Sequence, residues 1–430
     1  MDILRGSLGL VFFLGVAWLL SSHRSRFPWR LVIGGVVTQL VFAGLLLETE
    51  AGRDVFAWLA DQVQALISAA QPGAEMVFGA IANPQAMSEV FGSDPSDGAF
   101  VLGLAGSGLI VIIFFSALMS ILYHLGVMQL FVWLLARVLS ALLGVSGAEA
   151  MAMAANVFVG QTEAPLVVRP YISGMTRSEL NAMMTGGFAT VAGSVMAVYM
   201  GLVGPEYAPH LIAASVMSAP AAFVIAKIMQ PETETSQTAG AVPLRIDRTA
   251  SNVLEAATAG TSDGLKLWLN VMAMLIAFVA LVSLMDMPLG WLGEQIGLEG
   301  GLSLGRVLGW VFAPVAWLMG VNGWGECQLF GELLGIKIAL NDFVAFQQLT
   351  TMLPEGTNAG VHFAEPRHAA MAAYALCGFA NFASIGIQIG GISPLAPERR
   401  PELAQLAFRA MLGGAMASWM TATVAGMLLE

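Results

Sequence analysis

The sequence predicts an all-α polytopic membrane protein with eight transmembrane helices and two re-entrant helical hairpins. The first observation is composition, since 57% of the 430 residues are hydrophobic and only 11% are charged. That leaves too few polar side chains to cover a soluble protein of this size. The second is a set of apolar stretches long enough to cross about 30 Å of hydrocarbon. The third is a pair of longer apolar regions, each broken by glycine, proline and polar residues.

Eight apolar stretches have the length of a single crossing. They are Gly6–Ser22, Leu31–Leu47, Gly98–Tyr123, Leu180–Val203, Pro209–Ala226, Leu267–Met285, His368–Gly391 and Ala410–Leu429. Between the second and third, Arg53–Ala70 has apolar residues at helical spacing and acidic residues elsewhere. This pattern predicts an amphipathic helix along the membrane interface, with an ordinary helix outside the membrane as the alternative.

Basic residues set the orientation of these spans. If the chain starts outside, one group of loops carries most of the lysines and arginines: Arg24, Arg26, Arg30, Arg169, Arg177, Lys227, Arg245, Arg248, Lys266, Arg399, Arg400 and Arg409. The opposite side carries only Arg5, Arg53, Arg306 and Arg367. Because basic loops stay on the cytoplasmic side, we expect both termini to face outward.

Two apolar regions do not fit a single crossing. Met128–Tyr171 and Leu304–Phe346 are both interrupted by glycines and prolines. Each is about twice as long as one crossing, and the predicted topology requires the chain to leave each region on the side where it entered. We therefore predict a re-entrant hairpin in each, with a non-helical tip that is buried in protein or lines a cavity.

The two broken regions belong to an internal repeat. The matching segments are Leu143–Gly147 with Glu149, Met319–Gly323 with Glu326, Gly187–Thr190, and Gly378–Asn381. The order of hairpin, interrupted helix and helix therefore occurs twice, in a first repeat (128–229) and a second repeat (304–429). Since the copies begin on opposite sides of the membrane, their topology is inverted. Broken segments at equivalent positions indicate a transporter with its site near the membrane midplane.

Polar residues inside these apolar regions are the candidate site. Gln161, Thr162 and Glu163 combine an amide, a hydroxyl and a carboxylate, which suits a neutral polar ligand. The alternative is that they satisfy the freed backbone of the break. Glu326 has no cationic neighbour in sequence, and a carboxylate at hydrocarbon depth usually faces a cavity or a partner.

A second polar group follows on the last broken helix. Asn381 and Ser384 lie three residues apart and share a helix face beside Phe379, which can pack against a ligand ring. Hydrogen bonding between membrane helices is the other interpretation of this pair.

Other classes of function fit the sequence less well. The net charge of −11, with acidic loop residues in 231–238, argues against nucleic acid as a partner. The two cysteines, Cys327 and Cys377, lie in apolar stretches and are interpreted as small core residues. A membrane enzyme is disfavoured because the five histidines are scattered and no nucleophile with a base partner is evident. A channel would place its re-entrant loops on a symmetry axis, whereas this chain carries a complete site.

Several segments together resemble the concentrative nucleoside transporter family in its short bacterial form. They are Asn156–Pro165 with Gly-Gln-Thr-Glu, the acidic Glu326 followed by Asn341–Phe346, and Ala375–Phe382 with Gly-Phe-Ala-Asn-Phe. The similarity extends over essentially the whole chain. It implies a secondary transporter that imports nucleosides on a sodium gradient by alternating access. A proton-coupled cycle or another neutral polar solute is the runner-up.

The resemblance also implies the domain organisation. A homotrimeric scaffold would include residues 1–125, with spans 1–3 and the interfacial helix, and residues 231–302, with a cytoplasmic linker and span 6. A mobile transport domain would comprise residues 126–230 and 303–430. The protein would then lie in the inner membrane of a bacterium with both termini periplasmic.

The same resemblance implies which part of a nucleoside each site residue would contact. Gln161, Thr162 and Glu163 would face the nucleobase, with Val195 lining the base side. The residues implied on the ribose side are Glu326, Asn381, Ser384 and Phe379.

The coupling ion implied by the resemblance is sodium, between the first hairpin tip and the next helix break. The matching positions are Asn156, Val159, Thr190 and Val191. Unwound backbone carbonyls suit such an ion. Thr190 stands where the family more often has serine, which keeps the hydroxyl and adds a methyl group. In a proton-coupled cycle, Glu163 or Glu326 would titrate instead.

Overall fold

The chain is all-α in the computed structural model, which describes residues 2–83, 86, 109–240, 250–298, 301–354 and 362–429. Within these residues there are helices joined by turns and loops, and no strand. The helices that precede the first repeat are α1 (Asp2–Leu19), α2 (Trp29–Ala43) with its π-helical extension η1 (Gly44–Glu48), α3 (Glu50–Phe78) followed by η2 (Gly79–Ala82), and α6 (Val111–His124).

The two repeats have the same order of helices. The first contains α7 (Val127–Leu143), α8 (Gly147–Asn156), α9 (Ala164–Val167), α10 (Arg169–Ile172), α11 (Arg177–Ala189), α12 (Gly193–Val203) and α13 (Ala208–Met229). The long α14 (Val253–Gln295) then leads to the second. The second contains α15 (Leu304–Met319), α16 (Trp324–Ala339), α17 (Asp342–Met352), α18 (Pro366–Leu376), α19 (Phe382–Ile392), η4 (Ser393–Leu395), η5 (Pro397–Arg399) and α20 (Arg400–Leu428).

The predicted spans correspond to helices, with some changes in length. Among the described residues, six helical segments are long and apolar enough to cross a membrane, or eight if each bent helix pair counts as one span. Gly6–Ser22 overlaps α1, which begins and ends a few residues earlier. The first part of Gly98–Tyr123 lies outside the described residues, as do Arg245 and Arg248. The helix expected at Arg53–Ala70 is part of α3, which together with η2 is itself long enough to span.

Each region expected to be a two-armed hairpin consists of three parts. In the first, α7 turns into α8 at 144–146, and a second turn at 157–163 precedes α9. In the second, the chain bends by 110° between α15 and α16 at 320–323, and a second turn at 340–341 precedes α17. We name the second turns tip 1 (157–163) and tip 2 (340–341). Hydrophobic length alone could not distinguish the first turn from the second, because all three parts of each region are apolar.

The two interrupted helices lie close together at their breaks. α11 and α12 are separated by break 1 (190–192), and α18 and α19 by break 2 (377–381). Gly378 has φ +140°, and a Cβ built on it would lie 2.8 Å from the Phe188 carbonyl oxygen. A side chain at this position would therefore collide with the end of α11. The close approach of the breaks places non-helical backbone from both repeats at one location inside the protein.

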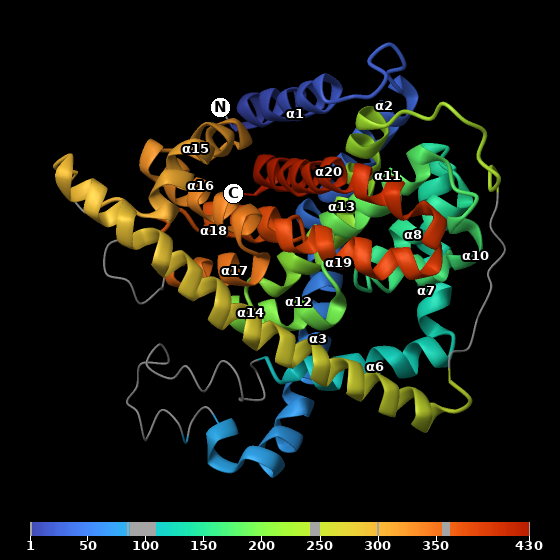
Figure 1. Cartoon of the computed structure of the whole chain (residues 1–430), viewed down its shortest axis with the longest axis horizontal. Coiled ribbons are helices and arrows are strands. Elements are labelled where there is room, and N and C mark those ends of the chain that lie inside the picture. The colour runs from blue at the N-terminus through green and yellow to red at the C-terminus, as the bar shows by residue number, and fades with distance from the viewer. Residues whose placement is uncertain are drawn as a thin grey trace.

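The helices of the repeats form the core, and α14 lies at the periphery. In the most apolar 18-residue segments of α13 and α20, 89% and 83% of the residues are buried inside the protein, whereas in that of α14 only 6% are buried. Figure 1 shows α14 as a long helix that runs diagonally across the front of the molecule, next to α6. With 43 residues, α14 is about 65 Å long, well beyond the roughly 30 Å of a bilayer core.

Contacts between remote segments define two ends of the molecule. At one end, Arg5 of α1 bonds to Asn322 in the α15–α16 turn, and Arg367 donates to the Gly426 carbonyl near the C-terminus. The labels N and C accordingly stand close together in Figure 1. At the other end, the N–H of Ser22 donates to the Met229 carbonyl. We call these the terminal end and the Lys227 end.

Candidate functional site

Tip 1 is held against break 1 by backbone and side-chain hydrogen bonds. The carbonyl of Phe158 accepts the N–H of Gly193 at 3.0 Å, and the carbonyl of Val157 accepts the hydroxyl of Ser215 at 2.9 Å. Glu163 folds back within the tip and accepts the N–H of Gly160 at 3.2 Å. The irregular backbone between α8 and α9 is therefore fixed to α12 and α13, although its residues lie outside any helix.

Tip 2 places a carboxylate at the start of a helix. Asn341 caps α17, since its side chain accepts the N–H of Val344 at 2.8 Å. Asp342, the first residue of α17, is buried, and both of its oxygens have donors. Tyr199 of α12 donates to one oxygen, and Asn381 Nδ2 donates to the other at 3.2 Å. A buried carboxylate with two donors and a helix N-terminus beside it is well compensated.

One face of α19 connects the two tips. Asn381 caps this helix by accepting the N–H of Ser384 at 2.8 Å, while it also donates to Asp342. One turn further, Gln388 Nε2 donates to Gln161 Oε1 of tip 1 at 3.1 Å. Ser384 and Gln388 share a face at i, i+4, and both are buried. A continuous row of polar side chains thus runs from Asp342 of the second repeat to Gln161 of the first.

The remaining predicted ligand-binding residues border this row to different degrees. Thr162 packs near the end of α19, since a Cβ on Gly391 would lie 2.5 Å from its methyl group. Val195 lies on the first turn of α12, one turn before Tyr199 and on the same face. Phe379 in break 2 is half-buried, whereas Glu163 is exposed.

The residues predicted for sodium lie at the contact between α8, tip 1 and break 1. Asn156 Nδ2 donates to the Met183 carbonyl at 3.4 Å, and the buried Asn156 Oδ1 has no hydrogen-bond partner. The Thr190 hydroxyl donates to the Gly186 carbonyl at 2.9 Å, which leaves its lone pairs available. No hydrogen bond among the described residues uses the carbonyls of Val159 or Val191. Oxygen acceptors without donors are the groups that a small hard cation binds.

The structure does not bring Glu326 into this set. Glu326 lies on the first turn of α16, and the 13 residues that follow it in that helix, about 20 Å, separate it from tip 2. Its two oxygens bond to the N–H of Ala364 at 3.0 Å and to Nδ1 of His368. The sequence match of Glu326 with Glu149 is structurally sound, because both begin the helix that leads to a tip. Neither residue lies at the tip itself.

Three residues that the sequence analysis did not assign form hydrogen bonds within the polar row or to it. Asp342 was part of the segment Asn341–Phe346 that carried the resemblance, and its place directly after a helix cap was a usable signal. Gln388 follows Ser384 by one helical turn, so helical periodicity could have added it to the pair Asn381 and Ser384. Tyr199 could not be found in this way, since its contact with Asp342 joins different repeats.

Three family models together match nearly all of the chain. Residues 8–81 match the N-terminus and residues 210–426 the C-terminus of the Na+ dependent nucleoside transporters, and residues 108–206 match a model described as nucleoside recognition. Sodium/nucleoside cotransporter 1 of Rattus norvegicus is 40% identical over 98% of this chain and 63% of its own length. The chain belongs to the Na+ dependent nucleoside transporter family. The family is one of transporters, not enzymes.

Bacterial relatives match this nucleoside transporter family member along its full length. Uncharacterized transporters of Haemophilus influenzae and Bacillus subtilis are each 43% identical over 100% of this chain and cover 98% and 100% of their own length. Among solved structures, CNTnw in an inward-facing substrate-bound state has a TM-score of 0.90 at 39% identity, covering 100% of this chain and 98% of CNTnw. A doubly substituted CNTnw in an outward-facing state has a TM-score of 0.91 at 40% identity, with the same coverage.

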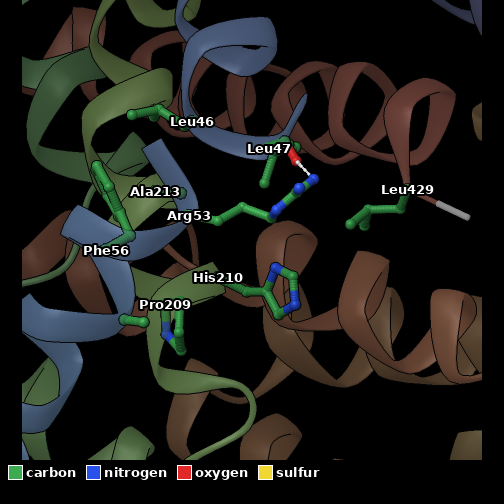
Figure 2. Close-up of a pocket in the computed structure, with 9 residues that line it drawn as sticks. Leu46, Leu47, Arg53, Phe56, Pro209, His210, Ala213 and Leu429 are labelled. Carbon is green, nitrogen blue, oxygen red and sulfur yellow. Dashed lines mark hydrogen bonds between the residues drawn. The ribbon is translucent and has the colours of Figure 1, made fainter. Parts of the chain in front are cut away.

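A separate cavity of about 270 Å³ contains none of the predicted site residues. Figure 2 shows Arg53 reaching into it, where its guanidinium donates to the Leu47 carbonyl at 3.2 Å; in this view the His210 ring lies below the guanidinium and Leu429 to its right. The other lining residues are almost all apolar. Among the described residues, no group of three or more His, Cys, Asp or Glu side chains is placed to hold a metal ion.

Proposed function

We propose that this transporter imports nucleosides by sodium-coupled alternating access. The observation that carries the proposal is the polar row on α19, which joins the two tips where the interrupted helices lie close together. An inverted repeat whose broken segments meet in this way is the usual setting of a transporter's substrate and ion sites. Membership in the family supplies the substrate class.

In this proposal Asp342, rather than Glu326, accepts the ribose hydroxyls. Asp342 bonds to Asn381 and lies beside the start of α19, whereas Glu326 is bonded to His368 and Ala364. A carboxylate can accept two neighbouring hydroxyl donors. The full ribose set is Asp342, Asn381 and Ser384 with Phe379, and the base set is Gln161, Thr162 and Glu163 with Val195.

Sodium is proposed to bind between tip 1 and break 1. The unpartnered Asn156 Oδ1, the unused carbonyls of Val159 and Val191, and the lone pairs of Thr190 Oγ1 would be its ligands. Because this site shares tip 1 with the base set, bound sodium would order Gln161 and its neighbours. Sodium and nucleoside would then raise each other's affinity by the same factor, as linkage requires.

The arrangement in the membrane is part of the proposal. We place the protein in a bacterial inner membrane, with the terminal end periplasmic and the Lys227 end cytoplasmic. A scaffold of residues 1–125 and 231–302 would hold a moving unit of residues 126–230 and 303–430, and three chains would associate through the scaffold. The low burial of α14 agrees with a peripheral scaffold role. Native mass spectrometry of the purified protein tests the trimer.

The decisive experiment is uptake into proteoliposomes. Purified protein is reconstituted, an inward sodium or proton gradient is imposed, and accumulation of labelled uridine, adenosine and an unrelated polar solute is measured. Sodium-driven accumulation of a nucleoside above its external concentration supports the proposal. Accumulation driven only by a proton gradient would mean that the coupling ion is the proton and not sodium. Accumulation of the unrelated solute alone would mean that the substrate is not a nucleoside.

A further inference from the structure

Gln388 is a fully buried glutamine in the middle of the polar row, and both hydrogens of its amide nitrogen are used. Nε2 donates to the Met184 carbonyl of α11 at 3.0 Å and to Gln161 Oε1 at 3.1 Å. Its exposed fraction is 0%. Gln388 therefore contacts a residue of the base set while belonging to the opposite repeat.

The hydrogen-bond chain fixes the orientation of both amides. The Met184 carbonyl can only accept, so the nitrogen of Gln388, and not its oxygen, must face α11. That nitrogen is also the atom facing Gln161, and therefore Gln161 must present its oxygen to Gln388. The remaining end of the Gln161 amide, which carries two N–H donors, points away from Gln388.

Both glutamines pack tightly against α11 at Gly187. A Cβ built on Gly187 would lie 2.7 Å from Gln388 Nε2 and 2.9 Å from Gln161 Cβ. The glycine thus lets both glutamines approach the backbone of α11. Gln161 is itself only 7% exposed, so water cannot readily substitute for a lost partner.

We propose that Gln388 is a specificity-determining positioning residue that locks Gln161 as a hydrogen-bond donor to a carbonyl oxygen of the nucleobase. This inference rests on the proposed function. When the buried N–H donor of Gln161 meets a carbonyl oxygen of the base, it gains a hydrogen bond. When it meets an amino group of the base, both N–H donors are left unpaired. The site accordingly favours bases with a carbonyl on the edge that faces tip 1.

Thionucleosides test the proposal because sulfur is a much weaker acceptor than a carbonyl oxygen. The binding of uridine, 2-thiouridine and 4-thiouridine to the full-length protein in detergent is measured by calorimetry in saturating sodium. We expect one of the two thio substitutions to weaken binding by about 3- to 10-fold, the value of one hydrogen bond. That substitution identifies the carbonyl that Gln161 contacts. Uridine binding with no loss for either analogue would overturn the proposal.

Two substitutions separate orientation from simple damage. We call the ratio of uridine affinity to thiouridine affinity the thio penalty. Gln388→Leu frees the Gln161 amide to rotate, so this ratio should fall toward one even if the affinity for uridine also drops. In Gln161→Leu the penalty should vanish, and adding Gln388→Leu to that variant should not change it further. A penalty that persists in Gln388→Leu, or that changes on the Gln161→Leu background, contradicts an action through Gln161.

A matched control exists elsewhere in the chain. Gln39 is equally buried, with 0% exposure, and its Nε2 donates to Thr421 Oγ1 at 3.0 Å. Gln39→Leu should leave the thio penalty unchanged. If Gln388→Leu does not yield folded protein, Gln161→Leu alone still decides whether the penalty depends on that amide. Absence of any nucleoside binding by the unmodified protein would refute the proposed function instead.

Discussion

The two repeats begin their tip-bearing helices with carboxylates that are anchored in different ways. In the first repeat, Glu149 of α8 forms an ion pair with Lys227 at 2.6 Å, and both side chains are nearly inaccessible, at 3% and 6% exposure. In the second, Glu326 of α16 is 18% exposed and bonds to His368, a residue that is charged only when protonated. The first anchor lies at the Lys227 end and the second at the terminal end.

This comparison separates residues that anchor a helix from residues that we propose to bind the ligand. At matching positions both repeats use a carboxylate to fix the start of a helix, and both reserve the far end of that helix for the tip. The chemistry diverges at the tips, where the first repeat presents Gln161 and the second presents Asp342. An acidic residue in an apolar region thus has two distinct uses in this fold, and its position along the helix decides between them.

The largest expected effect concerns the buried ion pair. Lys227→Met removes the cation and leaves the buried Glu149 with the N–H of Ser146 as its remaining donor, which costs about 3–5 kcal/mol of unfolding free energy. His368→Gln should cost less, about 1.5 kcal/mol, because Glu326 is partly exposed and keeps its bond to Ala364. Unfolding in detergent, followed by tryptophan fluorescence, measures both.

The double variant Lys227→Met, Glu149→Gln is the control for this prediction. It removes both charges and should recover a large part of the lost stability. Equal losses for the Lys227 and His368 variants would show that the two anchors do not differ in the manner described.

The next effect compares the two carboxylates of the second repeat. Asp342→Asn should weaken uridine binding by about 10- to 150-fold, since a charge-assisted hydrogen bond contributes roughly 1.5–3 kcal/mol. Glu326→Gln keeps the shape of the anchor and should change uridine affinity much less. Calorimetry on both variants and on 2′- and 3′-deoxyuridine provides the measurement. Severe loss in Glu326→Gln with normal binding in Asp342→Asn would return the ribose role to Glu326.

A third effect concerns the oxygen of Asn156. Asn156→Leu should raise the sodium concentration needed for half-maximal uridine binding by more than about tenfold, because a side-chain ligand is lost. Asn181→Leu is the control, since Asn181 is also buried, donates to a carbonyl at 3.1 Å and has an unpartnered Oδ1, but lies away from both breaks. Equal sodium shifts in the two variants would remove Asn156 from the ion site.

The sequence alone anticipated the parts of the fold that leave a pattern in hydropathy. The interruptions of α11–α12 and α18–α19 were predictable because Gly-Phe-Ala recurs before a polar residue, Thr190 in one copy and Asn381 in the other. The grouping of Asn381 with Ser384 followed from helical spacing. These features depend on neighbours in sequence, and such neighbours constrain each other directly.

The features that were missed depend on contacts between remote segments. Glu326 and Asp342 are both acidic residues in an apolar region. Only the folded chain reveals that the carboxylate of Glu326 bonds to His368 and that of Asp342 to Tyr199. The full extent of α14 was also hidden, since its polar first turns continue the helix beyond the apolar stretch Leu267–Met285. The sequence match between Glu149 and Glu326 points to the same role for both residues. The ion pair of Glu149 with Lys227 in the structure shows that this role is to anchor the start of a helix.

The smallest predicted effect sharpens the ion site at break 1. Thr190→Ala removes a hydroxyl but leaves the backbone carbonyl, so the sodium requirement should rise by about 3- to 10-fold with uptake preserved at saturating sodium. Thr423→Ala is closely matched, since Thr423 is fully buried and its hydroxyl also donates to a carbonyl four residues earlier, at 2.7 Å. The titration is uridine uptake against sodium concentration in proteoliposomes. An unchanged sodium requirement in Thr190→Ala, or an identical shift in Thr423→Ala, would place the coupling ion elsewhere than between tip 1 and break 1.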